Sequence, residues 1–240
     1  MSAKADIILI GISGPSSSGK STLARLLVAL FPGSFILHED DFYKPEADIP
    51  VKNGVVDWDC PGAIDFPQLF GALEYIKKNK KLPEDVAYKE DQNPIGIPPL
   101  SIEEAIEIKN TVLGSLTNLD SLQFCVIDGF LLYNDPSIIE TLDLRILLRA
   151  PHDLLKSRRE TRNGYATLEG FWVDPPEYFD KYVWPGYIES HKHLFANGDV
   201  DADLSEYAHN LNIHAIPALE LPMADLLKWT LELISAAFSA

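Results

Sequence analysis

A run of glycine and serine near the N-terminus ends in a lysine and one more serine. Residues 14–21 read Gly-Pro-Ser-Ser-Ser-Gly-Lys-Ser, which matches G-x-x-x-x-G-K-[ST] at every fixed position. Backbone N–H groups in such a loop curl around phosphate oxygens, and glycine permits the dihedral angles involved. Lys20 would then reach the β- and γ-phosphates of a nucleotide, while the Ser21 hydroxyl would ligate magnesium. The nucleotide contacts are therefore predicted at Gly14, Pro15, Ser16, Ser17, Ser18, Gly19, Lys20, Ser21 and Thr22.

A carboxylate that could help to hold a metal ion follows an apolar run farther along the chain. Asp128 comes directly after residues 124–127, which read Phe-Cys-Val-Ile and are typical of a buried strand. Oxygen ligands from one or two carboxylates suit Mg²⁺ at a kinase or ATPase site. We predict Ser21 and Asp128 as its ligands. The alternative for Asp128 is an ordinary turn residue in an Asp-Gly pair.

A cluster of three acidic residues comes after another apolar run. Glu39, Asp40 and Asp41 follow residues 34–37. Since the carboxyl ends of parallel strands face the ligand crevice, a carboxylate there can accept or orient the proton of an attacking hydroxyl. The cluster therefore favours phosphoryl transfer to an alcohol, with one of its carboxylates as the base and Lys20 as the second catalytic residue. A solvated acidic turn is the alternative interpretation.

Positive charge is concentrated in one stretch of an acidic chain. The net charge is −16, yet residues 145–162 carry Arg145, Arg149, Lys156, Arg158, Arg159 and Arg162 against only Asp153 and Glu160. We expect the last three arginines on consecutive turns of one helix, in a lid over residues 158–175. There they would stabilise charge on the transferring phosphate. A solvated helical face is the alternative, and we prefer it for Lys156.

The elements that must position these groups alternate along the chain. Buried strands are predicted over residues 7–12, 34–37, 124–127 and 142–148, and helices over 22–28, 65–78, 102–116, 152–162, 176–195 and 221–238. Pro185 is expected to interrupt or kink its helix, and residues 79–101 are expected to form an irregular insertion. Alternating strands and helices predict an α/β fold, with a parallel sheet covered on both faces, in a single domain over residues 1–240.

Composition excludes several classes of protein. The strongly acidic balance argues against binding to a nucleic-acid backbone, and no apolar stretch approaches the length of a membrane span. Cys60 and Cys125 lack metal-ligand spacing, so free thiols in a reducing compartment are expected, and we predict a cytoplasmic protein. The partners expected are ATP and a small molecule, and the oligomeric state is left open.

Several motifs together resemble the nicotinamide riboside kinase family, within the uridine-kinase-like P-loop kinases. Besides residues 14–21, these are His-Glu-Asp-Asp-Phe-Tyr-Lys-Pro at 38–45, Trp-Asp-Cys-Pro-Gly-Ala at 58–63, Ile-Asp-Gly-Phe-Leu-Leu-Tyr-Asn at 127–134, Arg-Arg-Glu-Thr-Arg at 158–162, Asp-Pro-Pro-Glu-Tyr-Phe-Asp at 174–180 and Val-Trp-Pro at 183–185. They follow the family's order from residue 7 to about residue 200. The resemblance implies a P-loop kinase fold and transfer from ATP to the ribose 5′-hydroxyl of nicotinamide riboside, in NAD salvage.

The resemblance also implies roles for individual residues. Asp40 would be the base and, with Ser21 and Asp128, a ligand of the magnesium ion. Trp58 and Tyr165 would stack on the pyridine ring, which is cationic and so is attracted to aromatic faces. Asp59 and Arg159 would bind the ribose hydroxyls, and Asp174 would line the same pocket. Arg158 and Arg162 would lie toward ATP. The full set of predicted substrate contacts is Asp40, Asp41, Tyr43, Trp58, Asp59, Arg159, Tyr165 and Asp174.

The chain departs from the family pattern at two points that bear on the pocket. Gly62 stands where an acidic residue is expected, and Asn163-Gly164 lengthens the spacing to Tyr165. Nicotinic acid riboside is a second candidate acceptor. The alternative functions are a uridine/cytidine kinase, whose pyrimidine would need amide-type partners, and a nucleotide-binding regulator without transfer activity.

Overall fold

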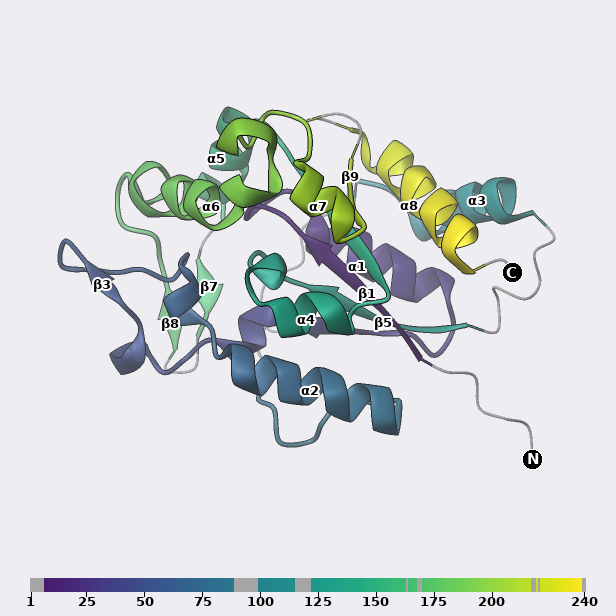
Figure 1. The fold of residues 1–240 in the computed structure, drawn as a ribbon, viewed down its shortest axis with the longest axis horizontal. Coiled ribbons are helices and arrows are strands. Elements are labelled where there is room, and N and C mark those ends of the chain that lie inside the picture. The colour runs from purple at the N-terminus through teal and green to yellow at the C-terminus, as the bar shows by residue number, and fades with distance from the viewer. Residues whose placement is uncertain are drawn as a thin grey trace.

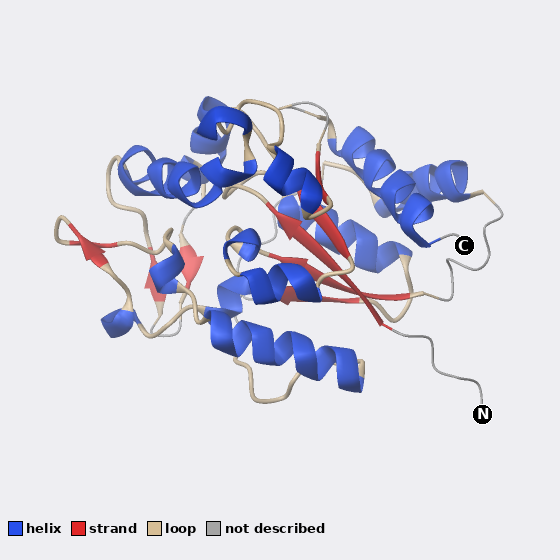
Figure 2. Ribbon diagram, in the orientation of Figure 1, coloured by secondary structure: helices blue, strands red, loops and turns tan. Residues whose placement is uncertain are grey.

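A computed structural model of the protein describes residues 7–88, 99–114, 122–162, 164–167, 170–216, 219 and 221–238. Its centre is a five-stranded sheet in the order β2-β5-β1-β6-β9, and every neighbouring pair is parallel. The strands are β1 (Ile7–Ser13), β2 (Phe35–His38), β5 (Gln123–Asp128), β6 (Leu144–Leu147) and β9 (Ile213–Ala215). Figures 1 and 2 show these strands running between two layers of helices, which confirms the predicted α/β class.

One face of the sheet is covered by α1 (Lys20–Leu30), α3 (Ile102–Leu113) and α8 (Met223–Phe238). The other face carries α2 (Phe66–Asn79), α4 (Pro136–Thr141), α6 (Trp184–His191) and α7 (Glu206–Asn210). Successive residues of β1 alternate between the two layers: Leu9 packs on the second layer, whereas Ile10 and Ile12 pack on the first. A strand that is buried on both faces reads as a continuous apolar run, as β1 does.

Smaller elements gather at one end of the sheet, around the end of β1 and the residues that follow β2. They are the hairpin of β3 (Val51–Lys52) with β4 (Val55–Val56), the hairpin of β7 (Tyr165–Ala166) with β8 (Phe171–Trp172), α5 (His152–Glu160) and a π-helical turn over Phe179–Val183. The π-helical turn packs with α5 in a separate apolar cluster. These elements surround the predicted site.

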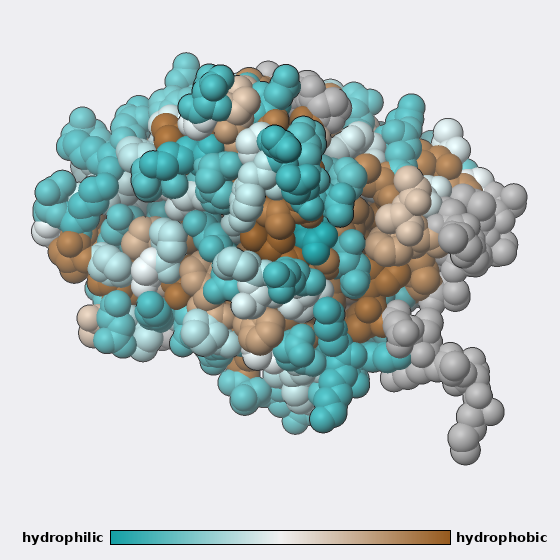
Figure 3. Space-filling view, in the orientation of Figure 1, coloured by the Kyte–Doolittle hydropathy of each residue, from teal (hydrophilic) through white to brown (hydrophobic). Residues whose placement is uncertain are grey.

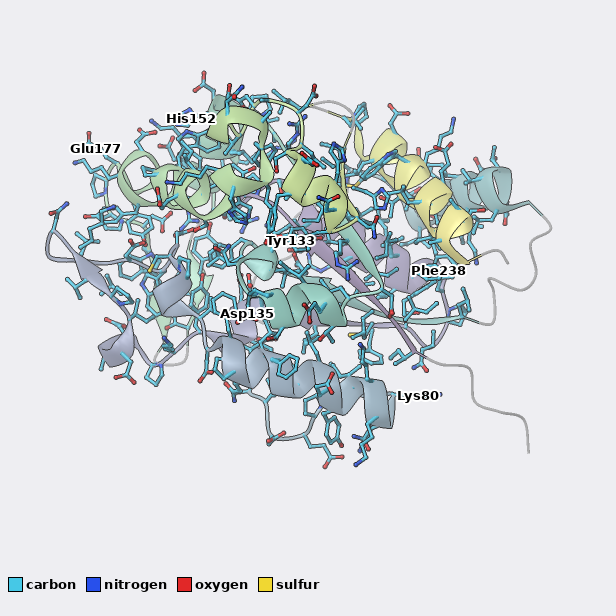
Figure 4. All side chains as sticks on the ribbon, in the orientation of Figure 1. Lys80, Tyr133, Asp135, His152, Glu177 and Phe238 are labelled. Carbon is cyan, nitrogen blue, oxygen red and sulfur yellow. The ribbon has the colours of Figure 1, made fainter. Side chains whose placement is uncertain are left out.

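Tyr133 links the sheet to the second layer of helices (Figure 4). The side chain is fully buried, and its hydroxyl lies 2.8 Å from the Ile146 carbonyl oxygen and 3.1 Å from that of Gly11. Burying a hydroxyl without a partner would be unfavourable, so these contacts fix the segment that follows β5. That segment begins at Gly129, directly after Asp128.

Two sequence predictions are corrected by the structure. Helix α5 ends at Glu160, so Arg162 lies beyond it rather than on its next turn. The prediction for Pro185 is confirmed, because the π-helical turn over Phe179–Val183 changes into α6 directly before this proline, so the hydrogen-bonding pattern of the predicted helix is interrupted there. Arg145 and Arg149 bind the carbonyl oxygens of Ile139 and Ala202, so the basic stretch does not act as one unit.

The remaining element predictions agree with the structure to within a few residues. Residues 80–88 and 99–101 contain no helix or strand, as expected of the insertion, whereas residues 89–98 and the predicted helix residues 115–116 lie outside the described part. Among the described residues, no helix is both long and apolar enough to cross a membrane.

Candidate active site

The phosphate loop connects β1 to α1 and needs glycine at both ends. Gly14 has φ 141°, and a Cβ there would lie 2.4 Å from the Leu148 carbonyl oxygen. Gly19 has φ 98° and precedes α1 without a side-chain cap. The hydroxyl groups of Ser13, Ser17 and Ser18 are buried and have no hydrogen-bond partner among the described residues. The loop is therefore a preformed concave turn at a helix N-terminus, the arrangement that binds phosphate.

Lys20 lies at the centre of the predicted charges. Its Nζ donates to the Pro15 carbonyl oxygen at 3.0 Å, within the loop itself. Burial lowers the pKa of Lys20, the negative charges of Asp128 and Asp40 raise it, and Arg162 lowers it further. All three charges act on one ammonium group. Around Lys20 the structure therefore brings together the predicted base Asp40, the predicted metal ligand Asp128 and Arg162, which was predicted to lie toward ATP.

Asp128 is buried and stays ionised. Burial alone would raise its pKa, but hydrogen bonds from His38 and Ser21 and the charge of Lys20 together lower it. The distance from His38 Nδ1 to Asp128 Oδ2 is 3.1 Å. An ionised carboxylate bonded to the Ser21 hydroxyl has the donor chemistry that magnesium prefers.

Glu39 is a buried neighbour to which the sequence assigned no role. Its Oε2 accepts a hydrogen bond of 2.8 Å from the Leu131 N–H, so it holds the turn that follows Asp128. Burial raises the pKa of Glu39 to about 7. Asp40 is half-buried and acts on Lys20, whereas Asp41 is buried and its charge raises the pKa of Tyr88 instead. Consecutive residues of the cluster thus face different surroundings.

Metal ligation at this place would depend on few protein groups. Among the described residues, no group of three or more His, Cys, Asp or Glu side chains could hold a metal ion. Mg²⁺ in phosphotransfer sites keeps several waters and is bound through one or two carboxylates plus the substrate phosphates. The donors Ser21, Asp40 and Asp128 therefore fit magnesium that arrives with a nucleotide, and they do not form a closed metal site.

Arg159 joins two predicted substrate residues. Its guanidinium is buried and binds both oxygens of Asp59, at 2.9 and 3.0 Å. The same group binds Asp174, through Nε at 2.6 Å and Nη2 at 3.2 Å. One planar cation is therefore held by two carboxylates, which fixes all three side chains.

Several aromatic side chains lie beside the ion pairs of Arg159 with Asp59 and Asp174. Tyr43 meets Trp58 edge-on with ring centroids 5.3 Å apart, and Trp172 lies on Trp58 at 5.8 Å. Tyr165 contacts other groups, because the guanidinium groups of Arg159 and Arg162 lie 5.0 and 5.5 Å from its ring centroid. The structure thus brings Trp58 and Tyr165 into one region, and it adds Trp172, which the sequence did not single out.

A small cleft of about 10 Å³ lies between the phosphate loop and Asp59. It is lined by Pro15, Ser16, Asp59, Phe130, Leu131, Val183, Tyr187 and His191. The phosphate loop and one predicted substrate residue, Asp59, therefore border the same hollow.

The structure explains why Gly62 departs from the family pattern, and why three residues near the site were not predicted from sequence. A Cβ at Gly62 would lie 2.7 Å from Pro50 Cγ, so an acidic side chain could not replace it without movement. Trp172 and His191 escaped prediction because single aromatic or histidine residues are usually ordinary core residues. His38 stood within a quoted motif, but only the register of β2 with β5 brings it to Asp128.

Comparison with known proteins gives a consistent set of relatives. No family model matches the chain. It is 43% identical over 227 residues to the nicotinamide riboside kinase of Schizosaccharomyces pombe, covering 95% of this chain and 96% of that protein. It is 38% identical over 228 residues to the nicotinamide riboside kinase of Saccharomyces cerevisiae, covering 93% of each.

More distant similarities were also found. Nicotinamide riboside kinase 2 of Homo sapiens is 27% identical over 192 residues, with 80% of this chain and 70% of the human protein covered. A sugar kinase from Janibacter sp. HTCC2649 has a TM-score of 0.48 at 12% identity, covering 97% of this chain and 96% of that one. A shikimate kinase from Acinetobacter baumannii has a TM-score of 0.41 at 15% identity, covering 96% and 94%.

Proposed function

The chain belongs to the nicotinamide riboside kinase family, and from this premise we propose that it transfers the γ-phosphoryl group of ATP to the ribose 5′-hydroxyl of nicotinamide riboside. The product is the mononucleotide, and the reaction belongs to NAD salvage. The observation that carries the proposal is that the phosphate loop, Asp128 and Asp40 lie at the ends of three neighbouring parallel strands, β1, β5 and β2, with Ile12 and His38 both in register with Asp128. A base, a metal ligand and a phosphate-binding cation thus share one place.

Residues 14–22 hold the nucleotide in this proposal. Their backbone N–H groups bind the phosphates, and Lys20 leaves the Pro15 carbonyl oxygen to bind the β- and γ-phosphates. Arg158 supports the loop from outside, since its Nη1 lies 3.4 Å from the Ser17 carbonyl oxygen. Arg162, which acts electrostatically on Lys20, stabilises the charge that develops on the transferred group.

Magnesium is held by Ser21, Asp40 and Asp128 in this proposal. When bound, it neutralises charge on the β- and γ-phosphate oxygens. His38 keeps the Asp128 carboxylate in place through the 3.1 Å contact. The Glu39 carboxylate fixes the turn after Asp128 through the Leu131 N–H, so both supporting residues act on the orientation of one ligand.

The acceptor is held on the opposite side of the cleft. Asp40 accepts or orients the proton of the 5′-hydroxyl. Asp59, Arg159 and Asp174 bind the ribose hydroxyls, and their mutual ion pairs already hold them in a fixed arrangement. The aromatic residues Tyr43, Trp58 and Tyr165 and the carboxylate of Asp41 complete the predicted contacts. Residues 1–240 act as a single kinase domain, with residues 158–175 as the lid.

A cationic ring suits this pocket better than a neutral pyrimidine. Aromatic faces attract a pyridinium through the ring quadrupole, and indole is the strongest of the natural side chains in this respect. Asp59 and Asp174 together carry more negative charge than Arg159 neutralises. We therefore expect nicotinamide riboside to be preferred to uridine. We also expect it to be preferred to nicotinic acid riboside, whose carboxylate cancels the charge of the ring.

Substitution of Asp40 tests this function. Asp40→Asn keeps the shape of the side chain and removes its basicity, so kcat with nicotinamide riboside should fall about 10²- to 10⁴-fold. Asp48→Asn is the matched control, because Asp48 is exposed a few residues farther along the same segment. Rates are measured with nicotinamide riboside, nicotinic acid riboside and uridine. Unchanged turnover in the Asp40 variant would exclude it as the base, and faster turnover of uridine by the native protein would exclude the assigned substrate.

A further inference from the structure

Helix α6 lies against both the acceptor segment and the phosphate loop. In its first turn, a Cβ at Gly186 would lie 2.5 Å from the Asp59 carbonyl oxygen, so a side chain there would push the two segments apart. At its last residue, His191 borders the hollow of about 10 Å³ that Pro15 and Ser16 of the loop share with Asp59. The end of α6 is therefore placed to act on the loop.

The side chain of His191 has one satisfied and one unsatisfied nitrogen. It is 1% exposed, and its Nδ1 lies 3.0 Å from the Tyr187 carbonyl oxygen, one helical turn earlier. Burial keeps the ring neutral, because it lowers the pKa of His191 to about 4. A carbonyl oxygen only accepts, so the single proton of the neutral ring is on Nδ1. Nε2 is left with a lone pair, and it has no hydrogen-bond partner among the described residues.

The Phe130 carbonyl group also acts on this ring, since it opposes the effect of burial on the pKa of His191. It cannot satisfy Nε2, because the lone pair and the carbonyl oxygen are both acceptors and neither supplies a proton. Leaving buried acceptors without a donor is costly. A group that can donate twice is needed between them.

The hollow has the size and the composition for one water molecule. Its volume of about 10 Å³ is close to the roughly 10–15 Å³ that a single water needs. Phe130 and His191 bring two acceptors to it, and Ser16 brings a hydroxyl group that can donate. Buried waters typically make about three hydrogen bonds. An anion would be repelled by the lone pair of Nε2 and a larger ligand would not fit, which leaves water as the occupant.

The turn that contains Phe130 is held from another side by Glu39. The Glu39 carboxylate accepts a hydrogen bond of 2.8 Å from the Leu131 N–H and another from the Phe130 N–H. This turn follows directly after Asp128, the last residue of β5. A water bound at His191 would hold the same turn through its carbonyl side and connect it with the phosphate loop.

We propose that the hollow binds one water molecule, which donates hydrogen bonds to His191 Nε2 and the Phe130 carbonyl oxygen and accepts one from the Ser16 hydroxyl. His191 is then a positioning residue. Through the water it holds the phosphate loop against the turn that follows Asp128, in the shape that receives the nucleotide. This inference deepens the proposed function and rests on its nucleotide site.

Two substitutions at His191 separate hydrogen bonding from packing. His191→Leu fills the space without an acceptor, and His191→Gln keeps an amide oxygen that can accept. Calorimetric titration with MgATP, without riboside, should give a Kd raised about 3- to 10-fold in the leucine variant and less than about twofold in the glutamine variant. The KM for nicotinamide riboside should change less than this Kd. His193→Leu is the control, because His193 is exposed farther along the same segment.

A crystal structure of the native protein gives the direct observation. It should show one water at about 2.7–3.2 Å from His191 Nε2, and a hollow without a water would overturn the inference. Normal MgATP binding in the leucine variant would also overturn it. So would equal weakening in both variants, because packing alone would then explain the effect. If the native protein binds MgATP but does not phosphorylate nicotinamide riboside, the proposed function fails, while these measurements still decide whether the water is bound.

Discussion

Individual residues of the site owe their charge states to burial and to one another. Lys20 and Asp128 are both buried, and each is held in its charged form partly by the other. Removing one partner would leave the other as an uncompensated buried charge, which is costly. The pair is therefore a single unit, and the effects of substituting its two members should not add.

The buried imidazole of His191 allows the effect of burial on the pKa of one residue to be tested. It is 1% exposed, and its Nδ1 donates to the Tyr187 carbonyl oxygen at 3.0 Å. Burial, assisted by the charge of Lys20, lowers the pKa of His191 to about 4. The imidazole is thus neutral in the folded protein down to about pH 4, while in the unfolded chain it takes up a proton below about pH 6.5.

This difference makes stability depend on pH in a defined direction. The contribution of His191 is complete above about pH 6.5 and is lost as the pH falls toward about 4, because the unfolded state binds the proton first. Between about pH 7 and pH 5 the free energy of unfolding should fall by about 2 kcal/mol through this residue. His191→Asn should remove that part of the slope in urea titrations at both pH values. His209→Asn is the control, because His209 is exposed. If the free energy of unfolding changes equally with pH in the native and His191→Asn proteins, the prediction is contradicted.

The site residues that belong to a motif could be identified from the sequence, whereas the residues that contact and support them could not. The loop pattern identified Lys20 and Ser21 because their spacing is required by phosphate geometry. Trp172 has no such spacing: it reaches Trp58 only because β7 and β8 pair and the Asp174 carboxylate holds its indole. Tyr165 lies over the Arg159 guanidinium, a contact that its position in the sequence did not indicate, and its place beside the acceptor's ring stays a prediction.

At the scale of elements, the turn from β1 into α1 sets the strictest requirement on sequence. Gly14 combines a positive φ with the close approach of the Leu148 carbonyl oxygen. Gly71 offers a contrast, because it lies on the exposed side of α2 and a Cβ there would meet nothing within 4 Å. The same substitution should therefore have opposite effects at the two places.

Gly14→Ala and Gly71→Ala form a matched pair of variants. The first should lower the free energy of unfolding by more than about 1 kcal/mol and weaken ATP binding, through backbone strain and the clash with Leu148. The second should raise the free energy of unfolding by roughly 0.5–1 kcal/mol, since alanine is the better helix former. Urea unfolding measures the free energy of unfolding of both variants, and nucleotide titration measures their ATP binding. A Gly14 variant that binds ATP normally would show that the turn tolerates a side chain.

Long periodic elements were predictable from sequence, whereas short ones were not. The apolar run of β1 and the helical pattern of α8 extend over several turns or residues, so local pattern and tertiary packing agree. Strands β7 and β8 have two residues each, and their pairing depends on Gly164 and on the rings beneath. The π-helical turn over Phe179–Val183 has no sequence pattern of its own, and it accompanies the stack of Tyr178 on Tyr182 at 4.8 Å.

At the scale of the whole molecule, charge is the dominant feature. The net charge of −16 is spread over a surface that is largely hydrophilic on the face in Figure 3, with hydrophobic patches beside α8. Like charges on a folded surface repel one another and destabilise the compact state. The positive groups that are predicted to bind phosphate are exceptions to this balance, and they lie at the loop and around the end of α5.

Salt should stabilise the protein for this reason. Raising sodium chloride from about 20 to about 300 mM shortens the screening length below about 10 Å and weakens the repulsion. A gain of about 1 kcal/mol would raise Tm by about 2–4 °C in a chain of this length. Thermal unfolding in sodium chloride and in choline chloride should give the same rise, since screening does not depend on the cation. A Tm that falls or stays constant with salt would show that attractive surface ion pairs such as Lys192 with Glu189 outweigh the repulsion.

The order of strands in the sheet has a consequence for how such enzymes diversify. Strands β2, β5 and β1 are consecutive neighbours in the sheet. The phosphate loop follows β1, Asp128 ends β5, and Asp40 comes shortly after β2. Ile12 of β1 and His38 of β2 are both in register with Asp128. Neighbouring strands lie about 4.8 Å apart, so the offset between the phosphate loop and the predicted base Asp40 is built into backbone pairing. Tyr165, which is predicted to contact the acceptor's ring, lies on a separate hairpin of β7 with β8. In the proposed function, replacing that hairpin would therefore change which alcohol is chosen, while the phosphate loop and Asp40 keep their positions.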